Sequence, residues 1–252
     1  MEYKILSIGN SFAVDTLQHV VEVAKTLNIN IKIYSLFIGG CSINRHYDNL
    51  VNDTNSYEFF VNEGEGFVTL KNITIKEALK LHKYDYINIQ HGSGDGSRYT
   101  DFSSYSKIVD IITIIKNLIN YDVKFIFNMT WVGEETFNHP ELISYNKDQY
   151  LMYSKICDVM KNHISKIKEI DYVSYTGTAI QNARKMTPTL LTRDGYHLSL
   201  TLGRYIAALN FLYTIFDFDI NEVRIIKDIT DDERDIAIKS VLATHDNPFL
   251  VL

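Results

Sequence analysis

The chain has 252 residues, 46% of them hydrophobic, and its 25 Lys and Arg against 31 Asp and Glu give a formal net charge of −6. This length fits one α/β domain or two small domains, and a core of that size needs no disulfide or metal staples. The acidic balance argues against a general nucleic-acid-binding protein, and two cysteines, Cys41 and Cys157, are too few for a disulfide framework and typical of a reducing compartment.

No targeting or membrane segment is expected. The N-terminal residues have no basic region followed by a long apolar run, so they do not resemble a signal peptide, although a chain that had lost its signal would look the same. The most apolar stretch, Ile108–Ile119, is interrupted by charged residues and is too short to span a bilayer. We therefore expect a cytoplasmic protein that binds neither membranes nor nucleic acid.

The first third of the chain predicts two buried strands, a helix and a hairpin. Lys4–Ile8 is a short apolar run that ends at a glycine, which is typical of a buried strand. Val14–Leu27 has apolar residues at helical spacing, and Ile31–Ile38 is a second strand rich in β-branched and aromatic residues. Two further short runs, Tyr57–Val61 and Phe67–Leu70, flank a turn containing two glycines and indicate a β-hairpin insertion.

Helices and strands continue to alternate in the remainder. Thr74 and Glu77 form the capping box of a helix that runs to about His82. Two strands follow, Tyr86–Gln90 and Val123–Met129, with a helix between them in the chain. The predicted helices and the last strand are, in chain order, Tyr105–Ile119, Lys147–Ile170, the strand Asp171–Tyr175, Thr178–Arg184, Leu200–Phe216 and Asp231–Ala243.

This alternation predicts a single domain, residues 1–252, with a parallel sheet covered by helices on both faces. Strands that alternate with helices pair in parallel through right-handed crossovers, and ligands bind beyond the carboxyl ends of such strands. The loops that follow the strands should therefore share one edge of the sheet. These loops are Gly9–Phe12, Gly39–Ser42, Gln90–Ser97 and Thr130–Gly133.

Ser11 is a candidate nucleophile in the first of these loops. It lies between the first strand and the first helix, where the helix dipole and free N–H groups favour negative charge. Its own N–H can help to hold the oxyanion that develops when an acyl group is attacked. Two other interpretations of the same loop are a simple helix cap and a phosphate-binding loop for a flavin or nucleotide, although the glycine-rich nucleotide motifs are absent.

A possible partner for this serine lies near the C-terminus. Asp194 stands three residues before His197 in the segment Arg-Asp-Gly-Tyr-His-Leu-Ser. A serine nucleophile needs a base, and the base needs a group that fixes its tautomer. The carboxylate could hold one ring nitrogen of His197 while the other faces Ser11; a surface Asp beside a helix-start His is the alternative.

These segments together resemble the SGNH (GDSL-like) hydrolase superfamily. The resemblance rests on Gly9-Asn10-Ser11-Phe12, Gly40 and the segment from Asp194 to Ser199, in the same order and over nearly the whole chain. A branch described only as a domain of unknown function is closer, because it shares Ile38–Ser42 followed by Arg45-His46.

The resemblance has definite implications for fold and chemistry. It implies a three-layer α/β/α sandwich with a flavodoxin-like five-stranded parallel sheet, and ester hydrolysis through a serine acyl-enzyme without a cofactor. Ser11 would be the nucleophile, His197 the base and Asp194 the carboxylate that orients it. The backbone N–H groups of Ser11 and Gly40 would be oxyanion donors.

One block departs from the superfamily pattern. The superfamily normally supplies an Asn side chain after the third strand, whereas this chain has Gln90 at the strand end and Gly94 at the directly aligned place. The branch that this chain resembles has Gln at the strand end, and a Gln amide can donate as Asn does. The resemblance therefore implies that Gln90 is the third oxyanion donor. A purely structural role at the strand end is the alternative, and a chain without a side-chain donor would be a slow enzyme or a non-catalytic relative.

Several further residues near the predicted edge have two interpretations each. Trp131, the only tryptophan, could stack on a sugar ring or fill the core. Arg45 and His46 could bind a polar group of the substrate or make ordinary loop contacts. Cys41 is best explained as a small buried residue, and the histidines show no metal-ligand spacing, so no metal site is predicted.

The leading hypothesis is a serine esterase that removes small acyl groups, most plausibly acetyl, from a carbohydrate. The alternative is a non-catalytic or weakly active carbohydrate-binding relative on the same fold. The expected partner is thus a small-molecule or oligosaccharide ester. The sequence leaves open the acyl group, the alcohol, the oligomeric state and the role of the insertion Asn52–Lys71.

Overall fold

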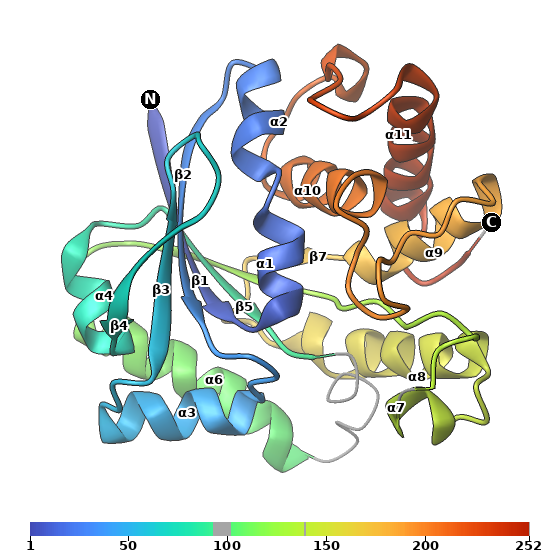
Figure 1. The fold of residues 1–252 in the computed structure, drawn as a ribbon. Helices are drawn as coiled ribbons and strands as arrows, with labels where there is room; N and C mark the ends of the chain where they lie inside the picture. The colour runs from blue at the N-terminus through green and yellow to red at the C-terminus, as the bar shows by residue number, and fades with distance from the viewer. Residues whose placement is uncertain (93–101, 139, 252) are drawn as a thin grey trace.

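The computed structural model describes residues 1–92, 102–138 and 140–251, which form a seven-stranded sheet between two layers of helices (Figure 1). The sheet order is β4-β3-β2-β1-β5-β6-β7. Five strands, β1, β2, β5, β6 and β7, pair in parallel, whereas β3 pairs antiparallel with β2 and β4 pairs antiparallel with β3. The strands are β1 (Glu2–Gly9), β2 (Asn30–Phe37), β3 (Tyr57–Asn62), β4 (Val68–Ile73), β5 (Tyr86–Gln90), β6 (Lys124–Asn128) and β7 (Tyr172–Ser174).

The predicted hairpin is present, but it is part of the main sheet. The prediction of a five-stranded parallel sheet is therefore correct for β1, β2, β5, β6 and β7 and incomplete at the edge beyond β2. β3 pairs with β2, and Phe37 lies opposite Glu58, so the hairpin extends the sheet by two antiparallel strands. A two-stranded hairpin is marginally stable alone, and pairing with an existing edge supplies the missing hydrogen bonds.

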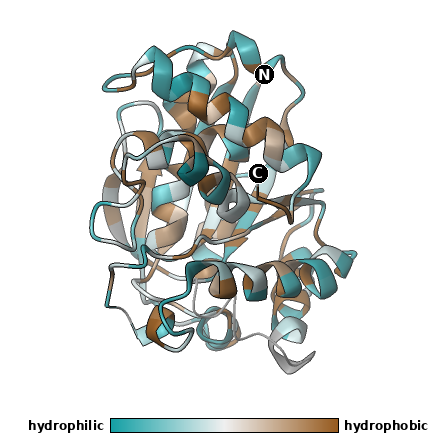
Figure 2. Ribbon diagram, turned by 90° about the vertical axis from the view of Figure 1, so that its right-hand side faces the viewer, coloured by the Kyte–Doolittle hydropathy of each residue, from teal (hydrophilic) through white to brown (hydrophobic). Residues whose placement is uncertain are grey.

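The two helical layers bury opposite faces of the strands. Successive side chains of β1 alternate: Leu6 and Ile8 pack with one layer, and Ile5 with the other. One layer contains α3 (Ile43–Asn52), α4 (Ile75–Leu81), α6 (Phe102–Leu118) and α8 (Gln149–Asn162). The other contains α1 (Ser11–Leu17), α2 (Val20–Thr26), α9 (Thr176–Met186), α10 (Leu202–Ile215) and α11 (Asp231–Asp246). Hydrophobic and hydrophilic residues alternate along the outer helices (Figure 2).

Two helix predictions are wrong in their extent. The helix expected over Val14–Leu27 is divided into α1 and α2 at Gln18 and His19, where the His19 ring contacts the backbone oxygen of Leu200 at 2.7 Å. The long helix expected over Lys147–Ile170 is shorter, because Lys147 has a positive φ and the chain leaves helical geometry after Asn162, before the 3₁₀ helix η1 (Ile164–Lys166). Helices α3 and α7 (Pro140–Ile143) were not predicted.

The parallel strands end at one common edge, as predicted. Gly9 lies opposite Phe37, Gln90 opposite Asn128, and Asn128 opposite Ser174. The loops that follow β1, β2, β5 and β6 therefore begin side by side, which places the predicted chemistry at this edge. In the described part of the chain, no helix combines the length and the apolar character needed to cross a membrane.

Candidate active site

Ser11 is the first residue of α1, but it is not the helix cap. That role belongs to Asn10, whose side-chain oxygen accepts a hydrogen bond of 3.0 Å from the Phe12 N–H. The preceding Gly9 has no room for a side chain, since a Cβ there would lie 2.4 Å from the Cβ of Ala13. The tight turn and the Asn10 cap therefore leave the Ser11 hydroxyl available for another partner.

That partner is His197, 186 residues further along the chain. The Ser11 Oγ lies 2.9 Å from His197 Nε2, and the opposite ring nitrogen, Nδ1, lies 2.7 Å from Asp194 Oδ2. The three side chains thus form a continuous hydrogen-bonded series. This is the geometry that a serine nucleophile, its base and an orienting carboxylate require.

The short turn from Asp194 to His197 is closed by the Asp194 side chain itself. Its Oδ1 accepts hydrogen bonds from the backbone N–H groups of Tyr196 (3.0 Å) and His197 (2.7 Å), and Gly195 has a φ of +81°, which favours glycine. Burial raises the pKa of Asp194, but these bonds and the one to the His197 ring outweigh it, so the pKa lies below its usual value. The carboxylate therefore stays ionised and able to accept from Nδ1.

A buried carboxylate that the sequence analysis did not identify joins this turn to α1. Asp15, one turn after Ser11, is 1% exposed in its side chain. Its Oδ1 lies 3.0 Å from Arg193 Nη1 and 2.9 Å from Arg204 Nε, and its Oδ2 accepts the Leu198 N–H at 2.9 Å. The segment that carries His197 is thus anchored on both sides to the helix that carries Ser11. The sequence did contain one indication of this role, because Asp15 is an acidic residue within an otherwise apolar helical stretch.

The loop after β6 supports the same turn from the other side. The Trp131 indole Nε1 donates to the Tyr196 backbone oxygen at 2.9 Å, and the Glu134 N–H donates to the Gly195 oxygen at 2.8 Å. Trp131 is only 1% exposed, and its ring packs against Phe12 with centroids 4.4 Å apart. Trp131 is thus buried in this structure, as expected for the core alternative, and its ring is not exposed for stacking on a sugar.

The loop after β2 brings Gly40 to this edge. The Asn10 amide donates to the Cys41 oxygen at 3.1 Å, which ties the loop to the residue before Ser11. Gly40 is exposed with a φ of +62°, a conformation that favours glycine. Arg45 is exposed, whereas His46 is fully buried with its Nδ1 2.8 Å from the Tyr57 hydroxyl, so His46 makes a core contact and does not present its ring to a substrate.

Gln90 is fully buried at the end of β5, beside the residue that precedes the Asn10–Ser11 pair. Its Cβ is 3.8 Å from the position that a Gly9 Cβ would occupy. Its Oε1 accepts a hydrogen bond of 3.1 Å from Asn128, while its Nε2 has no partner within the described residues. A buried donor without a partner is unusual in proteins. Gly94, the other position considered for the third block, lies outside the described residues.

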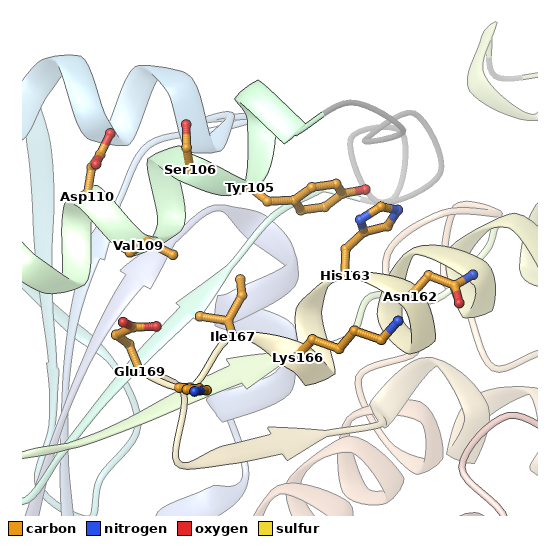
Figure 3. A pocket seen from close by; sticks show the side chains of 10 residues that line it. Tyr105, Ser106, Val109, Asp110, Asn162, His163, Lys166, Ile167 and Glu169 are labelled. Atoms are coloured by element: carbon orange, nitrogen blue, oxygen red, sulfur yellow. The ribbon is translucent and has the colours of Figure 1, made fainter.

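A separate cavity of about 510 Å³ lies between α6 and α8 (Figure 3). The ring of Tyr105 stacks on that of His163, with centroids 4.2 Å apart, and the lysine side chain of Lys166 lies nearby. None of the residues that line this cavity belongs to the Ser11–His197–Asp194 series. The triad therefore lies outside it.

The fold of this chain is shared with an esterase of known structure and with a second solved protein, as structural comparison shows. An acetylxylan esterase from Geobacillus stearothermophilus superimposes with a TM-score of 0.51 at 16% identity, over 88% of this chain and 96% of its own. The protein named TesA gives 0.51 at 12% identity, over 83% and 96%. At these identities the likeness establishes the fold alone.

The chain belongs to the family described as "Domain of unknown function (DUF4886)", which it matches over residues 4–242. A crystal structure of a DUF4886 family protein from Bacteroides uniformis ATCC 8492 superimposes with a TM-score of 0.90 at 30% identity, covering 100% of this chain and 98% of the other. No curated protein matches the chain.

Proposed function

We propose that this protein is a serine esterase that works through an acyl-enzyme on Ser11. The observation that carries the proposal is the unbroken series of hydrogen bonds from Ser11 Oγ through both ring nitrogens of His197 to Asp194. Asp194 and His197 are three residues apart in sequence, and Ser11 is 186 residues from His197. A structural role alone gives no reason for a hydroxyl, an imidazole and a carboxylate to meet in this order.

The proposed reaction follows from the positions of these groups. Ser11 Oγ attacks the acyl carbon while its proton passes to His197 Nε2, and the carbonyl electron pair moves onto the oxygen. Asp194 holds Nδ1 and stabilises the imidazolium that forms. The backbone N–H groups of Ser11 and Gly40 and the amide of Gln90 are the proposed donors to the oxyanion. The alcohol leaves with the proton, and water then releases the acid by the same route.

A small acyl group on a carbohydrate is the proposed substrate. The structural likeness to an acetylxylan esterase supports this choice at the level of fold. The exposure of Asp194 and Gly40 supports a site that is open to a bulky alcohol. Screening acetylated xylan and acetylated oligosaccharides against the purified protein would identify the preferred ester.

The decisive experiment replaces Ser11 by Ala. We expect hydrolysis of p-nitrophenyl acetate to fall by at least about 10³-fold, and labelling by a fluorophosphonate to disappear, with an unchanged circular dichroism spectrum. Ser154→Ala, an exposed serine on α8, is the matched control and should keep full activity. Full activity in Ser11→Ala would refute the proposal. Saccharide binding by the wild-type protein without turnover or labelling would support the non-catalytic alternative.

A further inference from the structure

The amide of Gln90 can face the nucleophile in two ways, and only one of them presents a hydrogen-bond donor. The NH₂ end would stabilise an oxyanion, whereas the oxygen end would repel it. Which end of the Gln90 amide faces the site depends on the group that holds the other end. That group is Asn128, the register partner of Gln90 on β6, and it is fully buried.

The orientation of Asn128 is determined by a backbone carbonyl of α1. The Thr16 hydroxyl lies 3.0 Å from the Phe12 oxygen, and a carbonyl oxygen can only accept, so the single hydroxyl proton of Thr16 is directed there. Towards Asn128, at 2.9 Å, Thr16 Oγ1 can therefore only accept. The atom of Asn128 that faces Thr16 must be the amide nitrogen.

The opposite end of Asn128 gives the same assignment. Its Oδ1 lies 2.7 Å from the hydroxyl of Thr176, which can donate to it. Thr176 Oγ1 in turn accepts from the amide of Asn210, which also donates to Ser174. All of these side chains are fully buried, so water does not compete for them. The donor and acceptor assignments therefore agree along the whole series of hydrogen bonds from Asn210 on α10 to Asn128 on β6.

The second N–H of Asn128 then meets Gln90 at 3.1 Å, which makes the facing atom of Gln90 its oxygen. The NH₂ of Gln90 is left on the other side, buried and without a partner among the described residues. We propose that Asn128 is a positioning residue that holds the Gln90 amide with its N–H groups directed towards the reacting acyl oxygen. This inference rests on the proposed esterase function and explains why a Gln can serve where its superfamily has Asn.

The test is a double-mutant cycle with p-nitrophenyl acetate. Asn128→Asp keeps the shape but offers only acceptors, so Gln90 must turn its NH₂ towards residue 128 and its oxygen towards the site. We expect kcat to fall about 10²–10³-fold with little change in KM, as for loss of one oxyanion donor. In a Gln90→Ala background, which has already lost the donor, the same substitution should change kcat by less than about twofold.

A purely structural role predicts a different result. If Asn128 only supports the fold, Asn128→Asp lowers kcat by the same factor in both backgrounds, and that outcome would overturn the inference. Should Asn128→Asp fail to fold, Thr16→Val decides the matter, because it removes the acceptor that fixes the amide direction. Its loss of kcat must then also vanish in the Gln90→Ala background.

Failure of the inference is distinguishable from failure of the esterase proposal. If the chain is not an esterase, wild-type protein shows no Ser11-dependent turnover, and the cycle has no activity to compare. If the chain is an esterase and Asn128 does not position Gln90, the wild-type protein turns over substrate. The effects of the Asn128 and Gln90 substitutions on kcat then multiply. The wild-type and Ser11→Ala measurements are therefore made first.

Discussion

Replacing Asp15 by Asn should both destabilise the protein and loosen the turn from Asp194 to His197. The substitution keeps the shape of the side chain but removes a charge that is 1% exposed and paired with Arg204 (14% exposed) and Arg193 (33% exposed). It also turns one acceptor oxygen into a donor that faces an arginine. Removing one partner of a buried ion pair costs about 3–5 kcal/mol, because the remaining charge is left uncompensated.

The expected effect is large enough to measure by thermal unfolding. For a chain of this size, 1 kcal/mol shifts Tm by about 2–4 °C, so Asp15→Asn should lower Tm by about 6–20 °C. Asp235→Asn is the control, since Asp235 is exposed and its surface pair with Arg234 is expected to contribute little to stability. An equal Tm shift in the two variants would refute the view that Asp15 anchors the fold.

A kinetic measurement separates anchoring of the turn from global stability. Asp15 also accepts the N–H of Leu198, next to His197. Its loss should therefore lower kcat even at temperatures well below Tm, where the variant is still folded. Assays at 15–20 °C with p-nitrophenyl acetate would detect this. Reduced stability with an unchanged kcat would mean that the Ser11–His197 geometry does not depend on Asp15.

Two further predictions concern buried rings. Burial lowers the pKa of His46 to about 3, whereas a histidine in the unfolded chain takes up its proton near pH 6.5. The unfolded state then binds more protons below about pH 6.5, so the free energy of unfolding decreases as the pH is lowered, by up to about 1.4 kcal/mol per pH unit. In urea titrations at pH 7.5 and pH 5, His46→Gln should flatten this dependence, and an unchanged slope would contradict the assignment. The fluorescence of Trp131 should be blue-shifted, poorly quenched by acrylamide and insensitive to added xylo-oligosaccharides; emission that responds to saccharide would restore the stacking role.

Local sequence patterns were sufficient for most of the secondary structure. The capping box at Thr74 and Glu77 is formed as predicted, because both partners lie within one turn. The glycine turn between Tyr57–Val61 and Phe67–Leu70 joins two strands for the same reason. The break at His19 could not be predicted, since it coincides with a contact to Leu200, 181 residues away.

The candidate site divides in the same way. Ser11, Asp194 and His197 belong to short motifs, and the chemistry of a nucleophile, a carboxylate and an imidazole is legible in the residue types alone. The polar residues that fix their geometry carry no such motif. Asp15 looks like an ordinary helical acid until Arg193 and Arg204 are seen around it, and Asn128 like an ordinary strand end until Thr16 is placed beside it.

The sequence by itself therefore determined the class of fold, the order of its elements and the three residues of the proposed triad. Only the tertiary structure decided that the hairpin extends the sheet, that Trp131 and His46 are buried, and that Asp15 is bonded to Leu198 and Asn128 to Gln90. The physical reason is the range of the interactions. Periodicity and capping act over a few residues, whereas burial and hydrogen-bond partners depend on segments more than 100 residues apart that meet only when the sheet has formed.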